Sequence, residues 1–166
     1  TVDDNTRCLD AARKYGIHMK ALMSIGHAGE TEETVNASRE WLLKVQPEDF
    51  DVTIITVLPG SPYFDASVKV PHPLGESHWV YTAKNGDKLY SVDIDYSKTM
   101  DYYKGVPGEY VSFVYTDDLS PKQLVSLRDA MENEVRPKLG LKPLQLVSAK
   151  NYDHSMGAIP AHIMKA

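Results

Sequence analysis

Two apolar runs, each followed by a turn that contains glycine, constrain the fold of this chain more than any other feature. The first run covers residues 17–25 and continues into residues 26–31 (GHAGET), and the second covers residues 50–58 and continues into residues 59–62 (PGSP). The residues between them have the length of one amphipathic helix, which Thr31 can cap. The pattern predicts a β-loop-α-β unit with two parallel strands. Because sites in such folds form at the carboxyl ends of strands, we expect both turns to share one rim.

The rest of the chain contains three further well-marked elements. Residues 3–15 have helical spacing, with a stripe formed by Cys8, Leu9, Ala12 and Tyr15. Residues 78–83 and 88–94 flank an Asn-Gly turn, which is typical of a β-hairpin. Residues 121–139 predict a helix, because Ser120 and Gln123 have the spacing of a capping box. We also expect an irregular proline-rich connector after Pro62, a short helix at 96–103, and short strands at 111–115 and 144–147.

Composition limits the classes of function that this chain can have. The 166 residues carry a formal net charge of -5, which argues against direct contact with nucleic acid because phosphate binding needs a basic face. No apolar run approaches the roughly 20 residues needed to span a bilayer, so we expect no membrane contact. Cys8 is the single cysteine, which excludes an internal disulfide and is compatible with a reducing cytoplasm. A cytoplasmic location is therefore expected.

The turn at residues 26–31 has the properties of a ligand-binding loop. Its glycines permit a tight turn and a close approach of a ligand to the backbone. The helix that begins near Thr31 would direct N–H groups at the rim, where a carboxylate or phosphate can bind. A tight turn with a purely structural role is the alternative for this motif taken alone. An unrelated phosphate-binding barrel enzyme is disfavoured, since residues 26–33 contain no basic side chain.

The two turns together resemble the later part of radical SAM enzymes. In that family a strand ends in Gly-x-Pro-Gly-Glu-Thr, a helix follows, and the next strand ends in Pro-Gly-Thr-Pro. Here Ala28 stands where proline is usual, and Ser61 stands where threonine is usual. The resemblance covers roughly residues 11–64. It implies an α/β fold in which residues 1–64 form the later half of a partial (β/α) barrel, and residues 65–166 form an extension with the β-hairpin and the helix at 121–139.

The resemblance also implies a site. In the family, S-adenosylmethionine lies across the strand ends, so the first loop would line the nucleoside and the second strand would meet the adenine. His27 lies in the same loop and would contact the substrate. The expected cofactor-binding residues are Ile25, Gly26, Gly29, Glu30, Val57 and Leu58.

The family's iron–sulfur cluster needs a CxxxCxxC loop, and the single Cys8 cannot supply three thiolates. We therefore expect a C-terminal fragment of a larger radical SAM enzyme, inactive alone, with no catalytic or metal-binding residue of its own. Its partner would be the N-terminal half of the same protein, and its small-molecule substrate is undefined. Residues 101–110 and 153–157 are similar to C-terminal portions of radical SAM proteins, many of which carry a cobalamin-binding domain upstream, so cobalamin is a further implied cofactor.

A second interpretation belongs to a different class. The polypeptide taken alone would be a non-catalytic binding or interaction module that retains part of the barrel fold, and the single cysteine favours it. In either case a barrel cut after its early strands leaves the apolar edge of residues 17–25 unpaired. Exposed strand edges template pairing, so we expect self-association through this edge.

Overall fold

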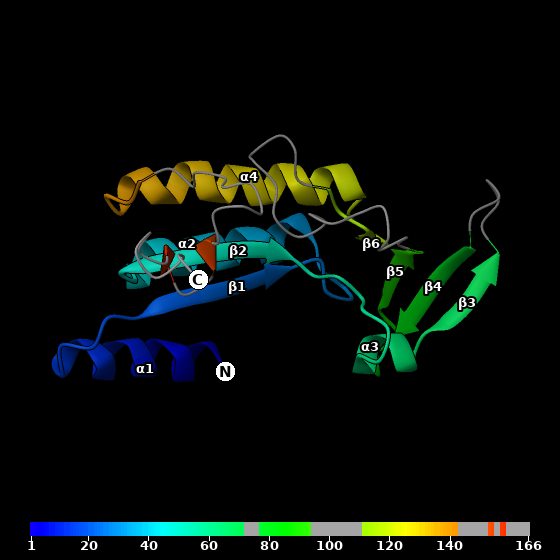
Figure 1. The fold of residues 1–166 in the computed structure, drawn as a ribbon, viewed down its shortest axis with the longest axis horizontal. Helices are drawn as coiled ribbons and strands as arrows, with labels where there is room; N and C mark the ends of the chain where they lie inside the picture. Colours follow the sequence, from blue (N-terminus) through cyan, green and yellow to red (C-terminus); the bar gives the residue numbers. More distant parts are fainter. Residues whose placement is uncertain (72–76, 94–110, 143–152, 155–156, 159–166) are drawn as a thin grey trace, which may run out of the picture.

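The structure is a computed structural model that describes residues 1–71, 77–93, 111–142, 153–154 and 157–158. It is a mixed α/β fold in which a parallel two-stranded sheet and an antiparallel four-stranded sheet share one core (Figure 1). The predicted α/β class is confirmed. The two parallel strands do not close a barrel in the described part of the chain.

The β-α-β unit predicted from the two apolar runs is present. It consists of β1 (Lys20–Ile25), α2 (Glu32–Val45) and β2 (Asp49–Ile54), with β1 and β2 parallel and in register from Lys20 opposite Asp49 to Ile25 opposite Ile54. Thr31 caps α2 as expected, and its side chain accepts a hydrogen bond from the Thr34 backbone N–H at 3.3 Å. Both strands are shorter than the apolar runs. Ile17 is 56% exposed because the chain is still turning out of the preceding helix.

The first helix, α1 (Val2–Lys14), packs beside α2, and its buried stripe is narrower than the sequence predicts. Leu9 and Ala12 are buried, whereas Cys8 is exposed and Tyr15 is 73% exposed, so the prediction for these two residues is wrong. The physical reason is that α1 is held to α2 largely by polar contacts. Thr6 accepts a hydrogen bond from the Trp41 indole at 3.0 Å, and Arg13 donates to the carbonyls at the end of α2.

The antiparallel sheet has the order β3-β4-β5-β6. Its strands are β3 (Val68–Pro71), β4 (Ser77–Thr82), β5 (Lys88–Val92) and β6 (Val114–Thr116). The β4–β5 hairpin confirms the Asn-Gly prediction, and its turn is closed by a hydrogen bond from the Ala83 N–H to the Asp87 carbonyl at 2.8 Å. The prediction of an irregular connector after Pro62 is wrong in part. Ser61 caps a short helix, α3 (Pro62–Asp65), and β3 follows this helix.

The remaining elements are α4 (Pro121–Lys138) and a minimal two-stranded ladder of β7 (Asp153–His154) and β8 (Gly157–Ala158). The capping box at the start of α4 is confirmed: Gln123 Oε1 accepts from the Ser120 N–H at 3.0 Å, and Ser120 Oγ accepts from the Gln123 N–H at 3.4 Å. The expected helix at 96–103 and strand at 144–147 lie outside the described residues. No helix in the described ranges has both the length and the apolar character required to cross a bilayer.

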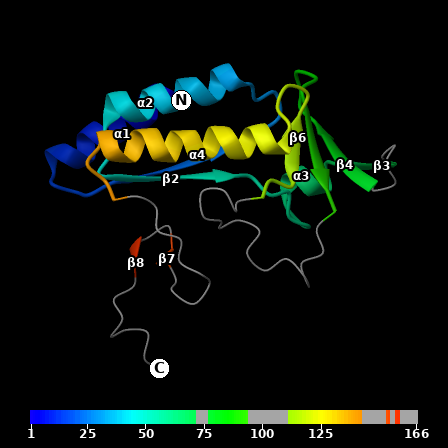
Figure 2. The ribbon, with the colours of Figure 1, turned by 90° about the horizontal axis from the view of Figure 1, so that it is seen from above.

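A single hydrophobic core joins the segments on either side of residue 64. It is formed where α2 and α4 cover one face of the parallel pair and where β5 and β6 meet its carboxyl end (Figure 2). Its least exposed members are Ile25, Val35, Leu42, Phe50, Val52, Leu89, Val114, Leu124, Met131 and Val135.

Side chains of α4 pair with the edge of β2 that faces away from β1. Alternate residues of a strand direct their backbone groups to opposite edges, and the Ile55 N–H bonds to the Ile25 carbonyl of β1 at 2.9 Å. The Val52 N–H therefore points the other way, and it donates to Glu132 Oε1 at 2.9 Å. The Val52 carbonyl accepts from Arg128 Nε at 3.0 Å. Side chains of α4 thus bond to backbone groups of β2 that would otherwise pair with a further strand.

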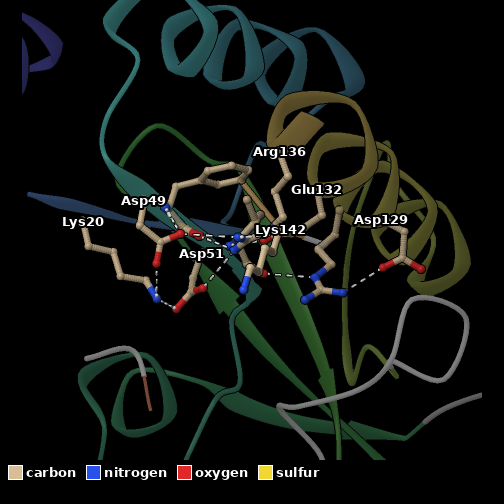
Figure 3. A network of polar contacts seen from close by, with 10 residues as sticks. Lys20, Asp49, Asp51, Asp129, Glu132, Arg136 and Lys142 are labelled. Carbon is tan, nitrogen blue, oxygen red and sulfur yellow. Dashed lines mark hydrogen bonds and ion pairs between the residues drawn. The ribbon is translucent and has the colours of Figure 1, made fainter. Parts of the chain in front are cut away.

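The buried charges of this edge neutralise one another (Figure 3). Arg136 donates to Glu132 at 2.5 Å and also lies 3.3 Å from Asp49 and 3.4 Å from Asp51. Lys20 on β1 bridges the same two aspartates at 3.0 and 2.9 Å. Burial raises the pKa of Glu132, and the opposing influence of Arg136 and of the Val52 N–H favours its carboxylate form. The ion pairs thus link α4, β2 and β1.

Replacing Glu132 with alanine should lower the free energy of unfolding by about 3–5 kcal/mol, because it leaves buried guanidinium groups without their carboxylate and the Val52 N–H without its acceptor. Urea denaturation followed by circular dichroism measures the change. The matched control is Glu134→Ala, which removes surface pairs to Arg39 and Lys138 and should have a much smaller effect. Equal losses in the two variants would contradict this account of the β2 edge.

Candidate ligand site at the strand ends

The two motif loops lie together at the carboxyl ends of β1 and β2. Ile25 and Ile54 are direct neighbours in the parallel register, so residues 26–30 and 55–61 leave the sheet at adjacent points. The His27 Nδ1 atom lies 3.2 Å from the Tyr63 hydroxyl, which joins the first loop to the helix that follows the second. In Figure 2 the arrow of β2 points toward α3 and the antiparallel sheet, and these elements border the rim.

Glu30 folds back onto its own loop. Its Oε2 atom accepts hydrogen bonds from the N–H groups of Gly26 at 2.6 Å and His27 at 3.2 Å. Its Oε1 atom accepts from the Thr34 hydroxyl at 3.3 Å. The carboxylate therefore occupies the position that an anionic ligand of these N–H groups would take. A ligand that reaches this loop finds the N–H groups of Gly26 and His27 already bonded.

Both glycines of the first loop are needed for close packing. A Cβ atom on Gly26, which has φ of 89°, would lie 3.1 Å from the Val114 side chain and 3.2 Å from that of Ile54. A Cβ atom on Gly29, which has φ of 75°, would lie 2.0 Å from the Asp87 carboxylate in the hairpin turn. The antiparallel sheet is thus seated directly on the loop, and the Thr116 hydroxyl of β6 donates to the Glu30 carbonyl at 2.9 Å.

The expected cofactor-binding residues differ in the fraction of their surface that is exposed. Ile25 is 1% exposed and Val57 is 7% exposed, so both residues lie in the core and offer a ligand almost no surface. Leu58 is 40% exposed and presents its side chain at the rim. The structure therefore brings the two groups of expected residues to one rim, where Leu58 offers a hydrophobic contact and the His27 side chain offers a polar contact.

The face of the parallel pair opposite α2 and α4 is called the open face here, because side chains of the described residues on it are exposed. Leu22 is 65% exposed, and Ser24 and Thr53 are also exposed, whereas Val52 and Ile54 on the other face are buried. Alternation along the strands places Lys20, Leu22 and Ser24 on this open face. An apolar side chain and two hydroxyl groups thus lead from the middle of the sheet to the rim.

A hydrogen-bonded chain of three side chains lies where the open face meets the rim. Ser24 Oγ lies 2.8 Å from His27 Nε2, and His27 Nδ1 lies 3.2 Å from the Tyr63 hydroxyl. Tyr81 of β4 packs edge-on against Tyr63 with ring centroids 4.7 Å apart. Only His27 was singled out by the sequence. Ser24 could have been found from its spacing of three residues across a strand end, but nothing local connects Tyr63 to His27.

Within the described ranges, no three His, Cys, Asp or Glu side chains gather closely enough to hold a metal ion. His78 is buried and bonds to the Tyr115 hydroxyl at 2.6 Å. The Tyr90 ring stacks on Tyr115, and a hydrogen bond from the Tyr90 hydroxyl to Asp117 raises the pKa of Tyr90 to about 12. These tyrosines therefore form a packing layer on the antiparallel sheet.

Comparison with known proteins leaves the class of the chain open. No protein-family model, curated protein or solved structure matches this chain.

Gly29→Ala should destabilise the fold through two separable effects. The positive φ costs about 1 kcal/mol, and the overlap with Asp87 adds about 1–3 kcal/mol. Gly60→Ala is the matched control, because Gly60 has φ of 82° and a Cβ atom added there would meet nothing within 4 Å. Chemical denaturation should show a larger loss for Gly29→Ala, and removing the carboxylate in an Asp87→Gly background should abolish the excess. An equal cost for both glycines would rule out the packing of the hairpin turn on this loop.

Proposed function

We propose that this chain is the C-terminal portion of a radical SAM iron–sulfur enzyme, in which it lines the adenosyl and substrate side of the active site. The parent enzyme would cleave S-adenosylmethionine reductively to generate a radical. The observation that carries the proposal is the meeting of the two motif loops, residues 26–31 and 59–62, at the carboxyl ends of adjacent parallel strands. That is where ligands bind in parallel α/β folds.

The open face of the parallel pair supports a partial barrel. In a (β/α) barrel the helices cover the outside and the opposite face of each strand points to the interior. Here α2 and α4 cover one face, and Leu22, Ser24 and Thr53 on the other face are exposed. In the proposed parent this face lines the interior, and residues leading from Leu22 to His27 form part of the substrate wall.

The two edges of the sheet differ, and this difference supports the proposal. The outer edge of β2 is already paired with Glu132 and Arg128 of α4, so β2 ends the sheet on that side. The outer edge of β1 pairs with no strand among the described residues. The proposal therefore places the N-terminal half of the same protein along β1.

The residues of this chain fit one of the three implied cofactors, S-adenosylmethionine, in part. Cys8 is a single exposed thiol on α1, so the chain cannot hold a 4Fe–4S cluster, and the cluster would belong to the N-terminal half. For S-adenosylmethionine, the Leu58 side chain and the partly exposed residues 27–30 of the first loop would border the nucleoside, whereas Ile25, Gly26 and Val57 lie buried behind them. A cobalamin-binding domain would likewise lie outside this chain.

Binding of the nucleoside portion can be tested with the chain itself. Titration with S-adenosylmethionine, followed by ¹⁵N-¹H NMR, should shift the amide signals of residues 25–30, 57 and 58. The Leu58→Asp variant should bind about tenfold more weakly, because it removes a partly exposed apolar contact. The control is Val68→Asp on β3, where the residue replaced is 66% exposed and is not one of the expected contacts, and it should bind as the wild type does. Shifts confined to other residues, or no shifts at millimolar ligand, would argue against the proposal.

A non-catalytic binding or interaction module is the second candidate, and the single cysteine is the observation that favours it. In this case the edge of β1 would bind a partner strand without any cluster chemistry. The two candidates differ in their response to S-adenosylmethionine, which only the first should bind.

Self-association through β1 is expected under either candidate when no partner strand is supplied. Sedimentation velocity at increasing concentration should show dimers, because an unpaired strand edge templates pairing. Lys20→Pro should weaken the dimer, since proline removes a backbone donor from this edge. The Val68→Asp variant changes the other sheet and should leave dimerisation unchanged. A monomer at all concentrations would contradict this expectation.

A further inference from the structure

The hydrogen-bonded side chains of Ser24, His27 and Tyr63 have the arrangement of a base-activated nucleophile. The Ser24 hydroxyl is exposed on the open face of β1 and lies 2.8 Å from His27 Nε2. When the ring proton is on Nδ1, this N–H donates to the Tyr63 hydroxyl oxygen at 3.2 Å, and Nε2 is left to accept the serine proton. A hydroxyl next to a base, with the base oriented by a third group, is the general form of nucleophilic activation.

The third group is held in place by the antiparallel sheet. Tyr63 follows the second motif loop in α3, and its ring packs edge-on against Tyr81 of β4 at 4.7 Å. The Tyr63 backbone carbonyl also accepts from the Ser67 hydroxyl at 2.6 Å. The Tyr63 hydroxyl orients the imidazole and selects its tautomer, but it does not supply the carboxylate that stabilises an imidazolium in a Ser-His-Asp triad. Tyr63 is therefore a positioning residue.

The backbone of the first loop also limits the class of acyl compound that can react. Two backbone donors of the same loop, the N–H groups of Gly26 and His27, already bond to the Glu30 carboxylate. They are not available to stabilise an oxyanion, and such donors supply a large part of the rate in acyl transfer. The arrangement therefore suits esters with a good leaving group and not amides.

We propose that Ser24 is a nucleophile activated by His27 and accepts acyl groups from activated esters at the open face of β1. In this step Ser24 Oγ forms a bond to the acyl carbon, and the bond from that carbon to the leaving oxygen breaks. The serine proton passes to His27 Nε2 and from there to the departing oxygen. No redox partner or metal takes part, and the inference does not depend on the radical SAM proposal.

The test uses the whole chain and p-nitrophenyl acetate. The expected result is a burst of p-nitrophenol equal to one per chain, with the acetyl group located on Ser24 by peptide mass spectrometry. Ser24→Ala should abolish the burst. His27→Gln keeps a hydrogen-bonding amide but removes the base, and it should slow acetylation by about 100-fold. Ser126→Ala removes an exposed serine on α4 and should react as the wild type does.

The Tyr63→Phe variant distinguishes a role in orienting the imidazole from a role in binding the ester. It should lower the limiting rate of acetylation several-fold and leave the ester concentration at half-maximal rate unchanged, because the phenol orients the imidazole and does not contact the ester. Circular dichroism of each variant verifies that it is folded. Acetylation at another residue, a full burst in Ser24→Ala (which would make His27 itself the nucleophile), or an undiminished rate in His27→Gln would overturn the proposal.

Discussion

The pairing of α4 with the outer edge of β2 is the interaction on which the arrangement of this protein depends. A two-stranded parallel sheet has two unpaired edges, and each buried N–H or C=O group left without a partner costs free energy. At β2 this cost is avoided by Glu132, Arg128 and Arg136, whose side chains bond to the backbone of Phe50 and Val52. Because these side chains are charged, they also need one another and the carboxylates of Asp49 and Asp51.

This edge contact determines the position of the rim. With α4 fixed along β2, its first turn carries Leu124 into the core beside Gly26, and the preceding strand β6 meets the first motif loop. The Thr116 hydroxyl then bonds to the Glu30 carbonyl, and the hairpin turn packs Asp87 against Gly29. The same arrangement leaves one face of the parallel pair open, so that Ser24 and His27 are accessible at the carboxyl end of β1.

Sequence reasoning succeeded where the responsible interactions are local. The caps at Thr31 and Ser120 and the hairpin turn at Asn85-Gly86 each depend on residues within one element or one turn, and the parallel β-α-β unit depends on three consecutive elements. It failed where the partners are distant in the chain. Glu132 and Val52 are separated by 80 residues, and His27 and Tyr63 by 36. The sequence also presented Glu30 as a ligand contact, and nothing in its local pattern shows that its carboxylate bonds to its own loop.

The most direct test of the central claim, that this chain is part of a radical SAM enzyme, is to determine the coding sequence upstream of Thr1. The account predicts an in-frame CxxxCxxC motif within a couple of hundred residues, together with the earlier strands that would pair along β1. A stop codon immediately upstream, or an upstream region without cysteine, would contradict it, and the chain would then be understood as a binding module with no cluster of its own.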